Sequence, residues 1–244
     1  FRVKALRSTT AAFQAEAGSA ANDLNLRNNE VQGSFRVSDG WFSNADLVAA
    51  RACVGWQHLR FDPAHGRIRQ PGGVMLDLSA IAKGFGVDKV AEYLESMGSR
   101  NYLVEIGGEL RINGVNGKGH PWRVAIEKPT ANAGSVQEVI VAGDNGVATS
   151  GEYRNYYEMD GQRFSHTIDP LTGKPITHRM VSVTVIHPSC MTADGLATAL
   201  TVMGTQKSLA YAKERGLAIF VITKTADGFE EAYSDAFKQY LVRK

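Results

Sequence analysis

The stretch from Tyr102 to Asn113, YLVEIGGELRIN, contains two short apolar segments joined by a Gly-Gly pair, and this pattern decides the fold. Gly107-Gly108 is typical of a tight turn, and each flanking segment has the length of a strand. Two strands joined so closely must run antiparallel, because a parallel crossover needs about a dozen residues or more. The stretch therefore predicts an antiparallel hairpin within a sheet.

Similar segments lie on both sides of this hairpin, and helical patterns separate some of them. We predict further strands at residues 59–62, 66–69, 122–127, 137–142, 147–150, 153–159, 163–168, 180–186 and 217–222. We predict helices at residues 11–17, 44–53, 79–99, 192–202, 206–215 and 232–237. No linker or internal repeat divides the chain. The pattern indicates an α+β fold with a largely antiparallel mixed sheet packed with helices, in a single domain over residues 1–244.

Composition places the chain among folded globular proteins and argues against several partners. Of its 244 residues, 43% are apolar and 21% charged, and the net charge is +2 without a basic run, so nucleic acid is not favoured. No window reaches the roughly 18 apolar residues that span a bilayer. Cys53 and Cys190 lack metal-ligand spacing, and we expect both to be free. The first residue is Phe1, so we expect that upstream residues have been removed.

The segment from Leu76 to Asp88, LDLSAIAKGFGVD, is the first candidate for chemistry. Asp77 precedes a helix that Ser79 can cap, and Lys83 lies in the first turns beside two glycines. Free amides, a lysine and close backbone approach would suit a phosphate or pyrophosphate. The structural alternative is an acidic helix start with a solvated lysine. Chemistry alone favours that alternative, because a Gly-x-Gly inside a helix is not a phosphate-binding fingerprint.

A second candidate is the helix that begins near Met191. If Thr192 caps it, Asp194 and Thr198 are four residues apart and share one face. A carboxylate and a hydroxyl in this arrangement are hard oxygen ligands suited to Mg²⁺. The alternative is that Asp194 complements the helix dipole and Thr198 is packed.

Two further clusters are weaker. His166 stands at a strand end with Asp169 close behind, where a general base could meet a substrate, although a lone histidine is more often structural. The glycine-bounded segment 146–153 could let backbone approach a ligand, and a tight hairpin explains it equally well.

The order and spacing of these clusters resemble those of a known family. The motifs are LDLSAIAKGFGVDKV, VEIGGEL, WRVAIEKP, GVATSGEYRNYY, SHTIDPLTGKPI and HPSCMTADGLATALTVMG. Together they resemble the ApbE family, the FAD:protein FMN transferases, over residues 74–222. Residues 1–45 do not align with the family pattern, and Gly195 stands at a helical position that usually holds alanine.

The resemblance implies a function and a set of site residues. The family uses Mg²⁺ to cleave FAD at its pyrophosphate, joining FMN to a threonine hydroxyl of a target protein and releasing AMP. Asp194, Thr198 and the backbone carbonyl of Ala80 match its metal ligands. The family positions that contact FAD are matched here by Asp77, Lys83 and Ile168. A family histidine that is important in transfer is matched by His166.

The resemblance also implies partners and a location. The expected acceptor is a redox-complex subunit carrying a flavinylation threonine, and the expected location is periplasmic or at the cell envelope, with membrane contact only through a lipid anchor on the precursor. We expect a monomer or dimer, with the site between residues 79–99 and the strands around His166. Two alternatives stay open: an FAD pyrophosphatase that uses water instead of threonine, and a non-catalytic flavin-binding protein.

Overall fold

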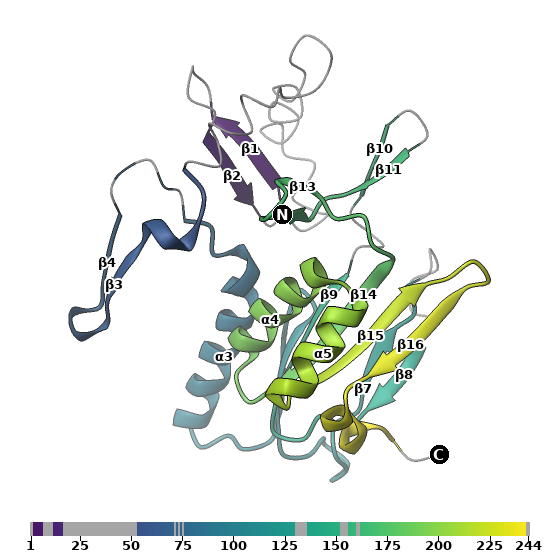
Figure 1. The fold of residues 1–244 in the computed structure, drawn as a ribbon. Coiled ribbons are helices and arrows are strands. Elements are labelled where there is room, and N and C mark those ends of the chain that lie inside the picture. Colours follow the sequence, from purple (N-terminus) through teal and green to yellow (C-terminus); the bar gives the residue numbers. More distant parts are fainter. Residues whose placement is uncertain are drawn as a thin grey trace. The chain divides into compact units, whose positions relative to one another are not determined.

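The computed structural model describes residues 2–6, 12–16, 53–70, 72, 74, 76–129, 136–151, 156–159 and 162–242 (Figure 1). The chain divides into two compact units. The first comprises Phe1–Ser79 and Thr167–Pro175, and the second comprises Ala80–His166 and Ile176–Lys244. The single domain stays a prediction.

The second unit is built on a six-stranded antiparallel sheet with the strand order β16-β15-β14-β9-β6-β5. The strands are β5 (Tyr102–Ile106), β6 (Glu109–Asn113), β9 (Gly146–Gly151), β14 (Met180–His187), β15 (Ala218–Lys224) and β16 (Phe229–Tyr233). The hairpin predicted around Gly107-Gly108 is present as β5 and β6, in which Ile106 pairs with Glu109. The predicted α+β fold and antiparallel sheet are confirmed.

Three helices cover one face of this sheet (Figure 1). They are α3 (Ser79–Ser96), α4 (Cys190–Met203) and α5 (Thr205–Arg215). Their small side chains, such as Ala193 and Ala212, pack on the strands, and this core includes Val183 of β14 and Val221 of β15. Small helix residues let the backbones come close to the sheet, so α4 is held firmly against β9 and β14.

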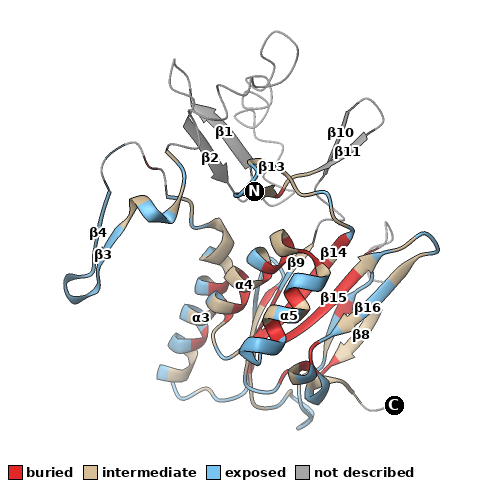
Figure 2. Cartoon of the chain, viewed as in Figure 1, coloured by how far each residue is buried: buried red, intermediate tan, exposed pale blue. Residues whose placement is uncertain are grey.

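The opposite face of the sheet forms a second buried core, and Figure 2 colours most of β14 and β15 as buried. It packs against the hairpin of β7 (Val124–Glu127) and β8 (Val136–Ile140) and against the 3₁₀ helix η4 (Asp235–Tyr240). Because both faces of β15 are covered, its sequence is a continuous apolar run instead of an alternating one.

Smaller antiparallel hairpins complete the described chain. They are β1 (Arg2–Leu6) with β2 (Ala12–Glu16), β3 (Arg60–Asp62) with β4 (Arg67–Arg69), β10 (Tyr156–Met159) with β11 (Gln162–Ser165), and β12 (Ile168–Asp169) with β13 (Lys174–Pro175). The helix predicted over residues 11–17 is wrong, because Ala12–Glu16 pairs along its whole length with Arg2–Leu6. Alanine favours a helix only weakly, and backbone pairing with another segment outweighs that preference.

Other boundaries also differ from prediction. The segment 232–237 ends strand β16 and begins η4, and the strand predicted over 163–168 is interrupted between β11 and β12. The helix predicted over 44–53 lies outside the described residues except for Cys53, which is in a turn.

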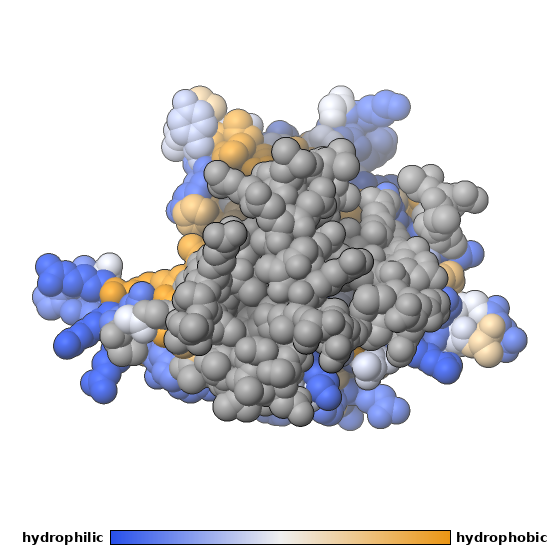
Figure 3. Space-filling view, turned by 90° about the horizontal axis from the view of Figure 1, so that it is seen from above, coloured by the Kyte–Doolittle hydropathy of each residue, from blue (hydrophilic) through white to orange (hydrophobic). Residues whose placement is uncertain are grey.

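No helix in the described part of the chain is both long and apolar enough to span a bilayer. Among the coloured residues of Figure 3, hydrophilic ones predominate, and the hydrophobic ones gather mainly at the left of the view.

Candidate functional site

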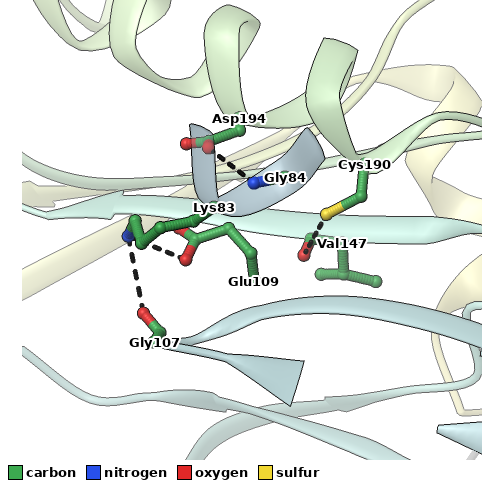
Figure 4. Close-up of polar contacts among 7 residues, drawn as sticks. All are labelled: Lys83, Gly84, Gly107, Glu109, Val147, Cys190 and Asp194. Atoms are coloured by element: carbon green, nitrogen blue, oxygen red, sulfur yellow. Dashed lines mark hydrogen bonds and ion pairs between the residues drawn. The ribbon is translucent and has the colours of Figure 1, made fainter. Parts of the chain in front are cut away.

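Asp194 lies in the second turn of α4 and points at the backbone of α3 (Figure 4). Its side chain is buried, and its Oδ2 accepts a hydrogen bond from the Gly84 amide at 3.0 Å. Burial raises the pKa of Asp194, and the Gly84 amide and the Lys83 ammonium offset only part of that rise. The carboxylate is therefore held in one orientation, at a position where a positive charge would stabilise it.

Glycines allow α4 to lie this close to its neighbours. A Cβ atom on Gly84 would be 2.4 Å from the Cys190 carbonyl oxygen, and one on Gly146 of β9 would be 2.6 Å from the Cys190 amide nitrogen. Side chains at either position would push the first turn of α4 away. The sequence suggested that Gly84 and Gly86 admit a ligand to the backbone, but both face protein atoms, since a Cβ on Gly86 would be 3.1 Å from Ile106.

The amides at the start of α4 are all bound by protein groups. Ser189, not the predicted Thr192, is the N-cap, and its hydroxyl accepts from the Thr192 amide at 3.3 Å. Asp88 of α3 accepts from the Cys190 and Met191 amides, each at 3.0 Å, and from the Ser189 hydroxyl at 2.8 Å. A carboxylate at a helix N-terminus also meets the positive end of the helix dipole. This helix end is therefore not a free anion site.

Lys83 of α3 forms an ion pair with a buried carboxylate that sequence reasoning did not single out. Its Nζ is 2.7 Å from Glu109 Oε2, and it donates to the Gly107 carbonyl at 3.4 Å (Figure 4). Glu109 is 2% exposed, whereas the Lys83 side chain is 43% exposed. Burial raises the pKa of Glu109 to about 7, although Lys83 acts in the opposite direction. Lys83 is thus anchored inside and still reaches solvent.

The other two predicted metal ligands lie on the same pair of helices. Thr198 is one turn beyond Asp194 on α4, and Ala80 is in the first turn of α3. In a regular α-helix the Gly84 amide donates to the Ala80 carbonyl, and here that amide donates to Asp194. The structure thus places Asp194 beside the turn that contains the Ala80 carbonyl.

This donor set is compatible with a hard divalent cation. A carboxylate, a hydroxyl and a carbonyl are oxygen donors of the kind that Mg²⁺ binds, with water or substrate oxygens completing the shell. Among the described residues, no three His, Cys, Asp or Glu side chains group as metal ligands. The predicted set contains only one such side chain, so this finding does not contradict it.

Asp77 lies just before α3, in the first unit. Its Oδ1 accepts from the Ser79 amide at 2.7 Å and from the Ser79 hydroxyl. Its Oδ2 is buried without a hydrogen-bond partner in the structure. Ser79 is the first residue of α3, and Asp77 binds both its amide and its hydroxyl. The role of Asp77 toward FAD stays a prediction.

The segment after β11 contributes to both units. His166, partly buried, closes the described β10–β11 segment in the second unit, and Ile168 begins β12 in the first. Asp169 Oδ1 accepts from the Leu171 amide at 2.8 Å, which holds the turn between β12 and β13. One oxygen of Asp169 is thus already used structurally. The roles of His166 and Ile168 stay predictions.

Sequence reasoning missed three contributors to this arrangement: Asp88, Glu109 and Ser189. A signal existed for Ser189, because a serine after a proline and before an apolar run is a common N-cap. No local signal marked Asp88 or Glu109. Both act on groups that are far away in the sequence.

Comparisons with known proteins agree with the motifs. A model of the ApbE family matches residues 4–221, which includes most of the segment 1–45 that the motifs left unaligned. An FAD:protein FMN transferase of Vibrio cholerae is 52% identical over 199 residues, covering 82% of this chain and 59% of that protein. One from Escherichia coli is 44% identical over 203 residues, covering 82% of this chain and 58% of that protein.

Solved structures show the same likeness. The flavin transferase ApbE from Vibrio cholerae has 49% identity and a TM-score of 0.75, covering 84% of this chain and 65% of that one. An ApbE protein of Thermotoga maritima has 29% identity and a TM-score of 0.73, covering 89% of this chain and 70% of that one. The chain thus spans just under 60% of the length of these two curated transferases.

Proposed function

We propose, starting from the fact that this chain belongs to the ApbE family, that it transfers FMN from FAD to a threonine hydroxyl of a target protein. The observation that carries the proposal is the buried Asp194 carboxylate, fixed by the Gly84 amide where α3 and α4 meet, with the Lys83 ammonium nearby. A fixed negative charge beside a fixed positive one is suited to a metal ion and the phosphates that accompany it.

Asp194, Thr198 and the Ala80 carbonyl are the residues that would hold Mg²⁺. When bound, the ion would neutralise charge on the pyrophosphate and on the departing AMP. The hydrogen bond from Gly84 keeps Asp194 in place before any ion arrives, which lowers the entropic cost of binding. Lys83 adds a second positive charge for the phosphate oxygens.

The transfer requires that a threonine oxygen attack the phosphorus of the FMN half. The bond from that phosphorus to the bridging oxygen breaks, and AMP leaves with the bridging oxygen. The hydroxyl proton passes to a base on this chain, for which His166 and Asp169 are the candidates. One oxygen of Asp169 accepts from the Leu171 amide, so its other oxygen would take the proton if Asp169 acts.

The proposed acceptor is a subunit of a redox complex, and the proposed location is the cell envelope. Both follow the habits of the family. The acceptor shares one test with the activity, and fractionation of cells that produce the protein would test the location. The protein is incubated with FAD, Mg²⁺ and an acceptor domain carrying a threonine flavinylation motif. Covalently fluorescent acceptor together with free AMP is the expected result, and replacing the acceptor threonine by valine should abolish the label.

The same assay separates the alternatives. Free FMN and AMP without labelled acceptor would identify a pyrophosphatase, and intact bound FAD would identify a flavin carrier. Asp194→Ala should abolish Mg²⁺-dependent labelling while circular dichroism shows a folded protein. Full labelling by this variant would overturn the assignment of Asp194 to the metal.

A further inference from the structure

Glu109 has no place in the proposed chemistry, yet its burial demands an explanation. It is 2% exposed at the start of β6, next to the Gly107-Gly108 turn. Burying a carboxylate costs several kcal/mol unless strong partners compensate, and a pair of apolar side chains would fill the same space at lower cost. A buried carboxylate paired with a partly exposed lysine points to a role in the site.

The geometry around Glu109 fixes one group, the Lys83 ammonium (Figure 4). The ammonium nitrogen is 2.7 Å from Glu109 Oε2 and 3.4 Å from the Gly107 carbonyl oxygen. The methylene stem also lies along the turn, since a Cβ on Gly107 would be 3.2 Å from Lys83 Cδ. Fixing a free lysine on a ligand costs side-chain entropy, and here much of that ordering precedes the ligand.

Charge supplies the second part of the argument. Among the side chains that the structure describes, Glu109 and Asp194 are the buried carboxylates. The charge of Asp194 helps to raise the pKa of Glu109, and Lys83 offsets part of the rise that burial causes in the pKa of Asp194. When both carboxylates are ionised, they and the one ammonium leave one negative charge. A divalent cation at Asp194 would repel Lys83, and Glu109 is the group placed to offset that repulsion.

We propose, resting on the function proposed above, that Glu109 is a positioning residue that holds the Lys83 ammonium beside the metal-binding carboxylate, ready to contact the pyrophosphate of FAD. Glu109 itself touches neither the flavin nor the metal. Glu109 affects FAD binding by holding Lys83, so its effect on FAD affinity requires the lysine.

A double-mutant cycle tests this dependence. FAD affinity is measured by flavin fluorescence with Mg²⁺ present for the unaltered protein, Glu109→Gln, Lys83→Met and the double variant. We expect Glu109→Gln and Lys83→Met each to raise the Kd for FAD about tenfold. The double variant should bind no more weakly than Lys83→Met alone. Its two neutral side chains leave no unpaired buried charge, so it folds even if Lys83→Met, which leaves the buried Glu109 carboxylate without its ammonium, does not.

Two controls separate positioning from general damage to the fold. Riboflavin has no phosphate, so its affinity should not change in Glu109→Gln, whereas a disturbed fold would weaken both ligands. Glu105→Gln removes the same charge from an exposed position on β5 and should leave FAD affinity unchanged. Additive losses in the double variant, equal losses for riboflavin, or unaltered FAD binding by Glu109→Gln would each overturn the proposal.

The outcome is independent of whether the chain is a transferase. If the unaltered protein binds FAD but neither labels an acceptor nor releases AMP, the proposed function fails, and the binding cycle still decides the role of Glu109. If it labels the acceptor and Glu109→Gln does so with unchanged KM and kcat, the function stands and the positioning role fails.

Discussion

Asp88 and Asp194 join α3 and α4 through reciprocal hydrogen bonds, each carboxylate accepting from a backbone amide of the other helix. Asp88 of α3 accepts from the Cys190 amide of α4, and Asp194 of α4 accepts from the Gly84 amide of α3, each at 3.0 Å. Within each helix the bound amide and the carboxylate are four residues apart, so each carboxylate is one turn beyond the amide that its partner binds. The contact therefore sets both the distance and the rotation of the two helices that carry the candidate metal ligands.

Removing Asp88 should loosen this contact. Asp88→Ala leaves the amides of Cys190 and Met191 without a charged acceptor, and we expect the free energy of unfolding to fall by about 2 kcal/mol. Urea unfolding followed by circular dichroism measures the change. Glu92→Ala is the control, because Glu92 makes only an exposed pair with Lys89 and should cost less than about 1 kcal/mol. Equal losses would show that the cap contributes little.

Substitution by alanine should change the stability of the protein differently at Gly84 and at Gly195. In Gly84→Ala the new methyl group would meet the Cys190 backbone at 2.4 Å, and we expect a loss of about 3 kcal/mol or more. In Gly195→Ala it would meet the Cγ2 methyl group of Ile81 at 3.1 Å, a contact that a shift of a few tenths of an ångström relieves. The gain in helix propensity is about 1 kcal/mol, so stability should stay level or rise. Thermal unfolding of both variants tests the contrast, which fails if Gly84→Ala is as stable as Gly195→Ala.

Glu109 should make stability depend on pH. Its pKa is 4.5 when unperturbed and about 7 in the folded protein, so the folded state holds the proton more tightly. The contribution of this group to the free energy of unfolding therefore falls as pH rises from 4.5 to 7 and is constant outside that range. At about 1.4 kcal/mol per pKa unit, the fall is about 3 kcal/mol.

The measurement compares the unaltered protein with Glu109→Gln in urea at several pH values between 4.5 and 8. The stability of the unaltered protein relative to the variant should decrease across this interval. A difference that does not vary with pH would mean that Glu109 titrates near its ordinary pKa. A difference that grows would mean that Lys83 outweighs burial.

The Cys190 thiol should be unreactive in the folded protein. It is fully buried against the Val147 carbonyl, and burial, aided by the charges of Asp88, Glu109 and Asp194, raises its pKa to about 12. In Cys53→Ser, the remaining thiol is that of Cys190. Ellman's reagent at pH 8 should therefore give no colour with the folded variant and should detect one thiol per chain after urea is added. Colour from the native variant would contradict the burial of Cys190.

Local patterns were sufficient for several elements of this protein. The apolar spacing after Ser79 predicted α3, and the Gly107-Gly108 pair predicted the β5–β6 hairpin, because periodicity and turn chemistry act within a few residues. Six motifs in order also indicated the family, which the family model confirms. Where a partner strand decides the outcome, as for Ala12–Glu16, local propensity predicted the wrong element.

The sequence by itself thus determined the class of fold, the family and the identities of the candidate ligands. Only the tertiary structure decided how those ligands are held. The hydrogen bond from Gly84 to Asp194 joins residues 110 positions apart, and the one from Cys190 to Asp88 joins residues 102 positions apart. The Glu109 carboxylate reaches Lys83 because β6 lies beside α3 in the fold. No pattern along the chain records such contacts, because the free energy of burying a charge depends on the groups that surround it in space.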